Sequence, residues 1–187
     1  MTLTLTPANQ LTLLRMLLIP AFVILVVYGH LGWALWVFTL AGITDALDGV
    51  IARRSGQYST LGAWLDPMAD KLLLVTTFVV LTMPGLSLAN RLPVWLTILI
   101  ISRDVVIVLT VAIVNLAIGR RTFVPSIYGK IATATYILTA VCAMLFNYLG
   151  YHSILVDAFV WTSLAITLVS AFHYIWHARR IIEAPGT

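Results

Sequence analysis

The chain has 187 residues, of which 61% are hydrophobic and only 10% are charged, with a mean hydropathy of +1.01. Soluble domains are about 45–50% apolar and about 25% charged, so this composition excludes a water-soluble domain. The net charge of +4 comes from basic residues scattered at the ends of apolar runs, which favours contact with anionic membrane lipids and excludes nucleic-acid binding.

Six apolar runs, separated by short breaks with glycine, proline or charged residues, predict six membrane-spanning helices. In chain order they cover residues 11–28, 31–52, 61–83, 93–118, 127–149 and 153–178. The breaks between them are too short for a further domain. We therefore predict one all-α membrane domain over residues 1–187, in which any chemistry must use residues within or beside the membrane.

The basic residues indicate how these spans are oriented, because an even number of spans places both termini on one side. That side holds Arg15, Arg53, Arg54, Lys71, Arg120, Arg121, Lys130, Arg179 and Arg180, whereas the opposite loops hold Arg91 alone. The positive-inside rule then places both termini in the cytoplasm. We expect a homodimer in the inner (cell) membrane of a bacterium.

Four aspartates lie where the second and third predicted spans approach the cytoplasm. Asp45 and Asp48 are three residues apart and Asp66 and Asp70 are four apart, so each pair shares one helix face. Because a short loop joins the two spans, we expect them to be antiparallel neighbours. All four carboxylates should then meet at a similar depth.

Four carboxylates in a low-dielectric site repel one another unless some are protonated or cations hold them together. Carboxylate ligands suit Mg²⁺ or Mn²⁺, and no Cys or His cluster lies nearby to favour a softer metal. Two such ions would neutralise a diphosphate and stabilise the attacking and leaving oxygens of a phosphoryl transfer. Space for a bulky group beside the ions would be left by Gly49, Ala52 and Gly62. Arg53 would reach phosphate oxygens at the rim of the site.

Two other classes of protein use acidic or polar residues inside a membrane. A transporter would distribute its carboxylates across the membrane depth, whereas these four lie at one level. A purely structural bundle packs helices through small and polar residues and needs no such excess of charge. The pattern therefore favours an enzyme, with a transporter as the alternative from another class.

The spacing of the four aspartates also resembles a known sequence motif. Residues 45–70 read D-A-L-D-G-V-I-A-R, eight further residues, and G-A-W-L-D-P-M-A-D. This segment resembles the signature of the CDP-alcohol phosphatidyltransferase family, D-x-x-D-G-x-x-A-R-x(8)-G-x-x-x-D-x-x-x-D, at all eight fixed positions. Asn9, Thr12 and Arg15 are similar to an N-x-x-T-x-x-R motif of members that form glycerophospholipids, as is the run L-D-P-M-A-D-K at 65–71.

The resemblance implies six helices, a site that faces the cytoplasm, and a role for each matched residue. The four aspartates would bind metal, and Asp70 would also act as the general base. The CMP and diphosphate parts of the donor would contact Gly49, Ala52, Arg53 and Gly62. In the implied reaction a hydroxyl group deprotonated by Asp70 attacks the lipid-side phosphorus of CDP-diacylglycerol, and CMP leaves.

The acceptor alcohol has to be inferred from the fourth and fifth spans. Arg103 lies mid-span, where it either pairs with an aspartate or binds an acceptor phosphate; Arg121 and Lys130 are further candidates. Lys130 follows Gly129, as in members that use glycerol phosphate, whereas I-S-R-D-V at 101–105 resembles cardiolipin-forming members. We predict glycerol 3-phosphate as the acceptor, with phosphatidylglycerol as the alternative.

Overall fold

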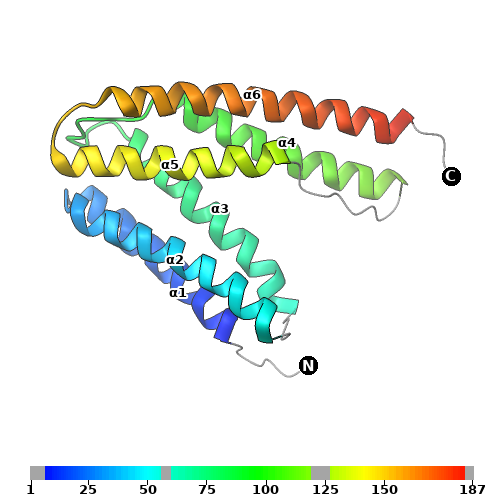
Figure 1. Cartoon of the computed structure of the whole chain (residues 1–187), viewed down its shortest axis with the longest axis horizontal. Helices are drawn as coiled ribbons and strands as arrows, with labels where there is room; N and C mark the ends of the chain where they lie inside the picture. The colour runs from blue at the N-terminus through cyan, green and yellow to red at the C-terminus, as the bar shows by residue number, and fades with distance from the viewer. Residues whose placement is uncertain (1–6, 56–59, 119–126, 184–187) are drawn as a thin grey trace. The chain divides into compact units, whose positions relative to one another are not determined.

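The computed structural model describes residues 7–55, 60–118 and 127–183, and the regular elements in these ranges are six α-helices (Figure 1). They are α1 (Pro7–Val27), α2 (Leu31–Ser55), α3 (Thr60–Thr82), α4 (Val94–Ile118), α5 (Ile127–Leu149) and α6 (Ile154–Glu183). Side chains are described except at 7–9, 46–55, 60–67, 111–115, 117–118, 175 and 177–183. The fifth predicted span matches α5 at both ends.

Among the described residues, three helical segments are long and apolar enough to cross a membrane: Gln10–Val27, Ile127–Leu149 and Ile154–Tyr174. Large apolar side chains also stand exposed on the helices, among them Leu17, Trp36 and Phe172. Such exposure is costly in water and normal against lipid. The predicted all-α membrane protein is confirmed, while six spans and cytoplasmic termini stay predictions.

The chain divides into two compact units. The first consists of Met1–Arg91 and Ala140–His152, and so contains α1, α2, α3 and the end of α5. The second consists of Leu92–Thr139 and Ser153–Thr187, with α4, the beginning of α5, and α6.

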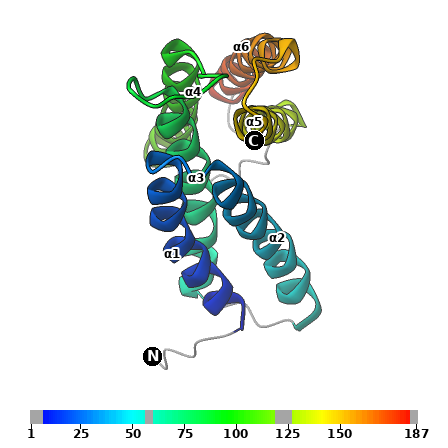
Figure 2. The same cartoon turned by 90° about the vertical axis from the view of Figure 1, so that its left-hand side faces the viewer.

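In the first unit α1 packs against both α2 and α3 (Figure 2). Its buried side chains Thr12, Arg15, Phe22 and Val26 recur at helical spacing along one stripe. The ring of Phe22 lies 6.0 Å from that of Phe38 on α2. We also expect α2 and α3 to be direct neighbours; the residues on either side of their connecting loop have side chains outside the described part of the chain, so this stays a prediction.

A glycine ends α1 and allows the chain to turn into α2. Gly29 has a φ of +78°, a conformation that is strained for residues with a Cβ. Its N–H donates to the carbonyl of Val26 at 3.0 Å, and the N–H of His30 donates to that of Leu25 at 2.8 Å. This is a Schellman motif, which satisfies carbonyls that the helix end would leave unpaired.

Two buried amides attach the segment between α3 and α4 to the end of α5. The backbone N–H of Asn90 donates to Oδ1 of Asn147 at 2.6 Å, and Nδ2 of Asn147 donates back to the carbonyl of Asn90 at 3.2 Å. Nδ2 of Asn90 donates to the carbonyl of Tyr151 at 2.8 Å. These reciprocal bonds satisfy polar groups that would be costly to bury alone.

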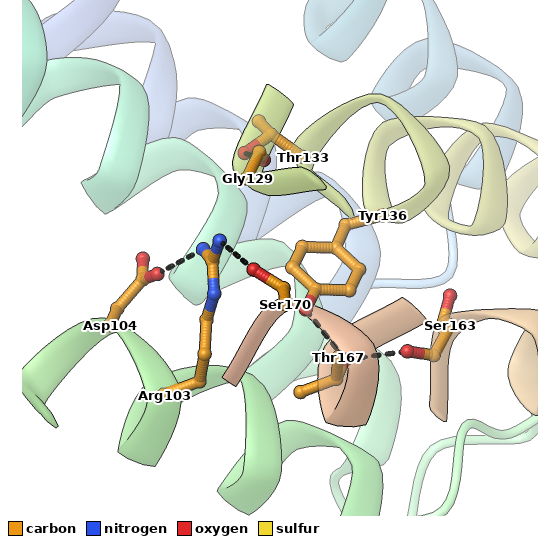
Figure 3. Close-up of polar contacts among 8 residues, drawn as sticks. All are labelled: Arg103, Asp104, Gly129, Thr133, Tyr136, Ser163, Thr167 and Ser170. Atoms are coloured by element: carbon orange, nitrogen blue, oxygen red, sulfur yellow. Dashed lines mark hydrogen bonds and ion pairs between the residues drawn. The ribbon is translucent and has the colours of Figure 1, made fainter. Parts of the chain in front are cut away.

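In the second unit α4 packs against α6, and hydroxyl groups join α5 to α6. The Tyr136 hydroxyl lies 2.6 Å from Oγ1 of Thr167, which also donates to the carbonyl of Ser163 at 2.5 Å (Figure 3). One turn along α5, Oγ1 of Thr139 lies 2.8 Å from Oγ of Ser163. Hydroxyl contacts of this kind are a common way to join helices in a membrane.

Candidate active site

Two of the four predicted metal-binding aspartates meet in the first unit at a buried arginine. Nη2 of Arg15 on α1 lies 3.1 Å from Oδ1 of Asp45 on α2. Nη1 of the same arginine donates to Oδ1 of Asp70 on α3. Three helices that are distant in the sequence therefore contribute one charged side chain each to this cluster.

The three side chains differ sharply in exposure. The Arg15 side chain is 1% exposed, whereas those of Asp45 and Asp70 are 47% and 45% exposed. Burial of a guanidinium is costly, and ion pairs with two carboxylates offset that cost. Each carboxylate contacts Arg15 through Oδ1, and almost half of each aspartate side chain is exposed. The acidic side of the cluster is thus accessible to a ligand.

The chemistry of this donor set fits a divalent cation such as Mg²⁺ or Mn²⁺. Hard cations take oxygen ligands, and half-exposed carboxylates from two helices provide them. Asp48 and Asp66 lie on the same helices as Asp45 and Asp70, but their side chains are outside the described residues. Within the described part of the chain no group of three or more His, Cys, Asp or Glu side chains comes together. The full ligand set stays a prediction.

The residues predicted to contact the donor lie on the same two helices. Gly49, Ala52 and Arg53 follow Asp45 along α2, and Gly62 lies near the start of α3. Their side-chain positions are outside the part of the chain that the structure describes. Only the helical backbone that carries them is established.

The residues predicted to bind the acceptor belong to the second unit. Nη1 of Arg103 lies 2.8 Å from Oδ1 of Asp104, and Nη2 donates to Oγ of Ser170 on α6 at 3.0 Å (Figure 3). The side chains of Arg103 and Asp104 are 9% and 19% exposed. Pairing with an aspartate, one of the two roles considered for Arg103, is therefore observed. Lys130 is exposed in the first turn of α5, and Arg121 lies outside the described residues.

Sequence reasoning did not identify Arg15 as part of the site. Its charge was assigned to membrane orientation, yet the structure buries it between helices and pairs it with two acids. Its location inside the first apolar run was the available signal, because an ionisable residue within a span usually has a partner or a function. Thr12, one turn earlier in the same motif, is buried as well.

The chain is similar to known proteins over most of its length. The sequence model of the CDP-alcohol phosphatidyltransferase family matches residues 5–171. A probable phosphatidylglycerophosphate synthase of Mycobacterium tuberculosis is 38% identical over 130 aligned positions, which cover 65% of this chain and 57% of the relative. This chain therefore spans little more than half of that protein.

Two relatives with another name match over more of the chain. A CMP-forming cardiolipin synthase of Streptomyces coelicolor is 32% identical over 193 aligned positions, 96% of this chain and 86% of the relative. The CMP-forming cardiolipin synthase of Homo sapiens is 32% identical over 195 positions, 95% of this chain and 63% of the relative. Since the family match covers most of the chain, including all four aspartates of the motif, the protein belongs to the CDP-alcohol phosphatidyltransferase family.

Proposed function

We propose that this membrane protein transfers the phosphatidyl group of CDP-diacylglycerol to a hydroxyl group of a glycerol-based acceptor and releases CMP. The observation that carries the proposal is the meeting of Asp45 and Asp70, from the two helices that hold the family motif, at one buried arginine. Both carboxylates remain accessible, as a site for a charged substrate requires. Family membership supports the nucleotide donor.

Divalent metal is part of this proposal, since the family generally depends on it. The residues that would hold two Mg²⁺ or Mn²⁺ ions are Asp45, Asp48, Asp66 and Asp70. When bound, the ions would neutralise the diphosphate of the donor and the charge on the departing CMP.

The chain's own residues would supply the proton transfer and the positioning. Asp70 accepts the proton of the acceptor hydroxyl, whose oxygen forms a bond to the lipid-side phosphorus as the bond from that phosphorus to CMP breaks. Arg53 pairs with diphosphate oxygens at the end of α2. The small residues Gly49, Ala52 and Gly62 leave room for the nucleotide beside the two helices.

Two acceptors are supported by different observations. Glycerol 3-phosphate is supported by the higher identity to the probable phosphatidylglycerophosphate synthase. Phosphatidylglycerol is supported by the wider match to the cardiolipin synthases and by the I-S-R-D-V run in α4. The residues proposed to bind an acceptor phosphate are Arg103, Arg121 and Lys130. Arg103 would have to share its guanidinium with Asp104 and Ser170.

The proposed placement of the protein follows from its apolar helices and its charges. All six helices would span a bacterial inner membrane, with both termini and the aspartates at the cytoplasmic side. The positive-inside distribution supports this orientation. Exposed apolar side chains would contact lipid and a second copy of the chain in a homodimer.

The direct test is CMP release by the purified full-length protein in lipid nanodiscs. CDP-diacylglycerol and Mg²⁺ or Mn²⁺ are supplied with glycerol 3-phosphate or phosphatidylglycerol, and the lipid product is identified by mass spectrometry. We expect metal-dependent CMP release with one of the two acceptors. Release with neither of them, or equal release after chelation of metal, would contradict the proposal.

A further inference from the structure

Arg15 has no part in the reaction as proposed above, although it contacts two of its central residues. Its guanidinium donates through one terminal nitrogen to Asp70, the proposed base, and pairs through the other with Asp45, a proposed metal ligand. These carboxylates belong to different helices, and α1 packs against both of them. Arg15 is therefore the described residue that links the two halves of the motif.

We propose that Arg15 is a positioning residue whose two-pronged guanidinium sets the separation and orientation of Asp45 and Asp70 for metal binding and proton transfer. The inference rests on the function proposed for these aspartates. Arg15 acts through the carboxylates and need not touch a substrate.

Burial makes Arg15 a firm support for side chains that are themselves accessible. The arginine is fully buried in the stripe of α1 that also contains Thr12 and Phe22. Asp45 and Asp70 are each almost half exposed, and an exposed side chain keeps rotamer freedom unless a contact restricts it. An ion pair to an immobile partner restricts that freedom and holds each oxygen in one direction.

The geometry of the guanidinium, and not its charge alone, explains why an arginine is present. Its planar fork presents separate N–H groups, so it binds one carboxylate at each terminal nitrogen. Lysine carries the same charge at a single nitrogen on a flexible stem. Exchange of arginine for lysine therefore keeps the electrostatic balance of the site and removes the two-pronged restraint.

The experiment compares Arg15→Lys with wild-type protein by two independent readouts. CMP release at saturating Mn²⁺ gives kcat and the KM for CDP-diacylglycerol, and electron paramagnetic resonance gives Mn²⁺ binding to metal-free protein without substrates. We expect kcat to fall about ten- to hundredfold with little change in KM. We expect the half-saturating Mn²⁺ concentration to rise about tenfold, because the ligands lose a supporting partner.

Phe22→Leu is the matched control, because Phe22 is buried on the same helix, two turns after Arg15, and its ring contacts that of Phe38 on α2. It should lower thermal stability while kcat and Mn²⁺ binding stay at wild-type values. Equal losses in this control would attribute the effect of Arg15 to destabilised packing and overturn the proposal. Wild-type kcat and Mn²⁺ binding in Arg15→Lys would overturn it as well.

Arg15→Gln keeps the test decisive if the lysine variant does not fold. Glutamine removes the buried charge and cannot reach both carboxylates, so kcat should fall at least as far as expected for lysine; a retained kcat would refute the positioning role. Failure of the proposed function is seen separately, as the absence of CMP release by wild-type protein. Mn²⁺ binding still measures the positioning role in that case.

Discussion

Arg15 is fully buried and Arg103 largely buried in apolar helices, yet they engage their acidic partners in opposite ways. Arg15 joins aspartates of two other helices, Asp45 and Asp70, whose side chains are nearly half exposed. Arg103 pairs with Asp104, its neighbour in the sequence, which is itself mostly buried, and with Ser170 on α6. The first arrangement is long-range and open, and the second is largely local and enclosed.

The difference indicates what each arrangement can do within its own unit. An enclosed pair balances its buried charges internally, so its main effect is to hold the structure together. An open pair leaves carboxylate oxygens accessible, and these can bind a cation or accept a proton. The carboxylates of the Arg15 cluster can therefore take part in catalysis, whereas the main effect of the Arg103 contacts is to hold α4 against α6.

The largest expected effect follows from removal of one carboxylate from each arrangement. Asp70→Asn should lower turnover by about 10²–10⁴-fold, because an amide cannot accept the proton, while nucleotide binding weakens less than in Asp66→Asn. Asp104→Asn should keep most of the turnover and lower thermal stability. CMP release, nucleotide binding and thermal unfolding measure these effects. Near-normal turnover in Asp70→Asn would remove the contrast between the two sites.

An intermediate effect is expected from Arg103→Lys, which tests whether the enclosed arginine also binds the acceptor. Loss of two-pronged phosphate contact should cost about 1.5–3 kcal/mol, roughly a ten- to hundredfold drop in kcat/KM for the acceptor. The KM for CDP-diacylglycerol should change little. Donor and acceptor kinetics that fall alike, together with lower thermal stability, would limit Arg103 to a structural role.

The smallest effect is expected at Ser170, the hydroxyl partner of Arg103. Ser170→Ala removes one hydrogen bond to the guanidinium and leaves the pair with Asp104, so stability should fall by about 1–2 kcal/mol. CMP release should stay unchanged. Thermal unfolding of the variant and of wild-type protein measures the loss of stability. A strong loss of CMP release without any loss of stability would show that the α4–α6 contact serves catalysis.

The sequence by itself determined the helices and the chemical class. Apolar runs between glycine, proline and charged breaks identified α5 to the residue, and the spacing of four aspartates identified the family. Both are local properties, because a helix and its faces depend on residues a few positions apart. Helix ends were harder to predict: α1 begins at Pro7 and α6 ends at Glu183, because a helix can continue through polar residues beyond its apolar run.

Only the tertiary structure decided which charges are joined. Arg15 lies 30 residues before Asp45 and 55 before Asp70, and no periodicity in the sequence relates these positions. The pairing depends on the packing of α1 against both α2 and α3, which no pattern in the sequence indicated. A buried cation needs nearby anions in a medium of low dielectric constant, so once packing had buried Arg15, the two accessible aspartates became its partners.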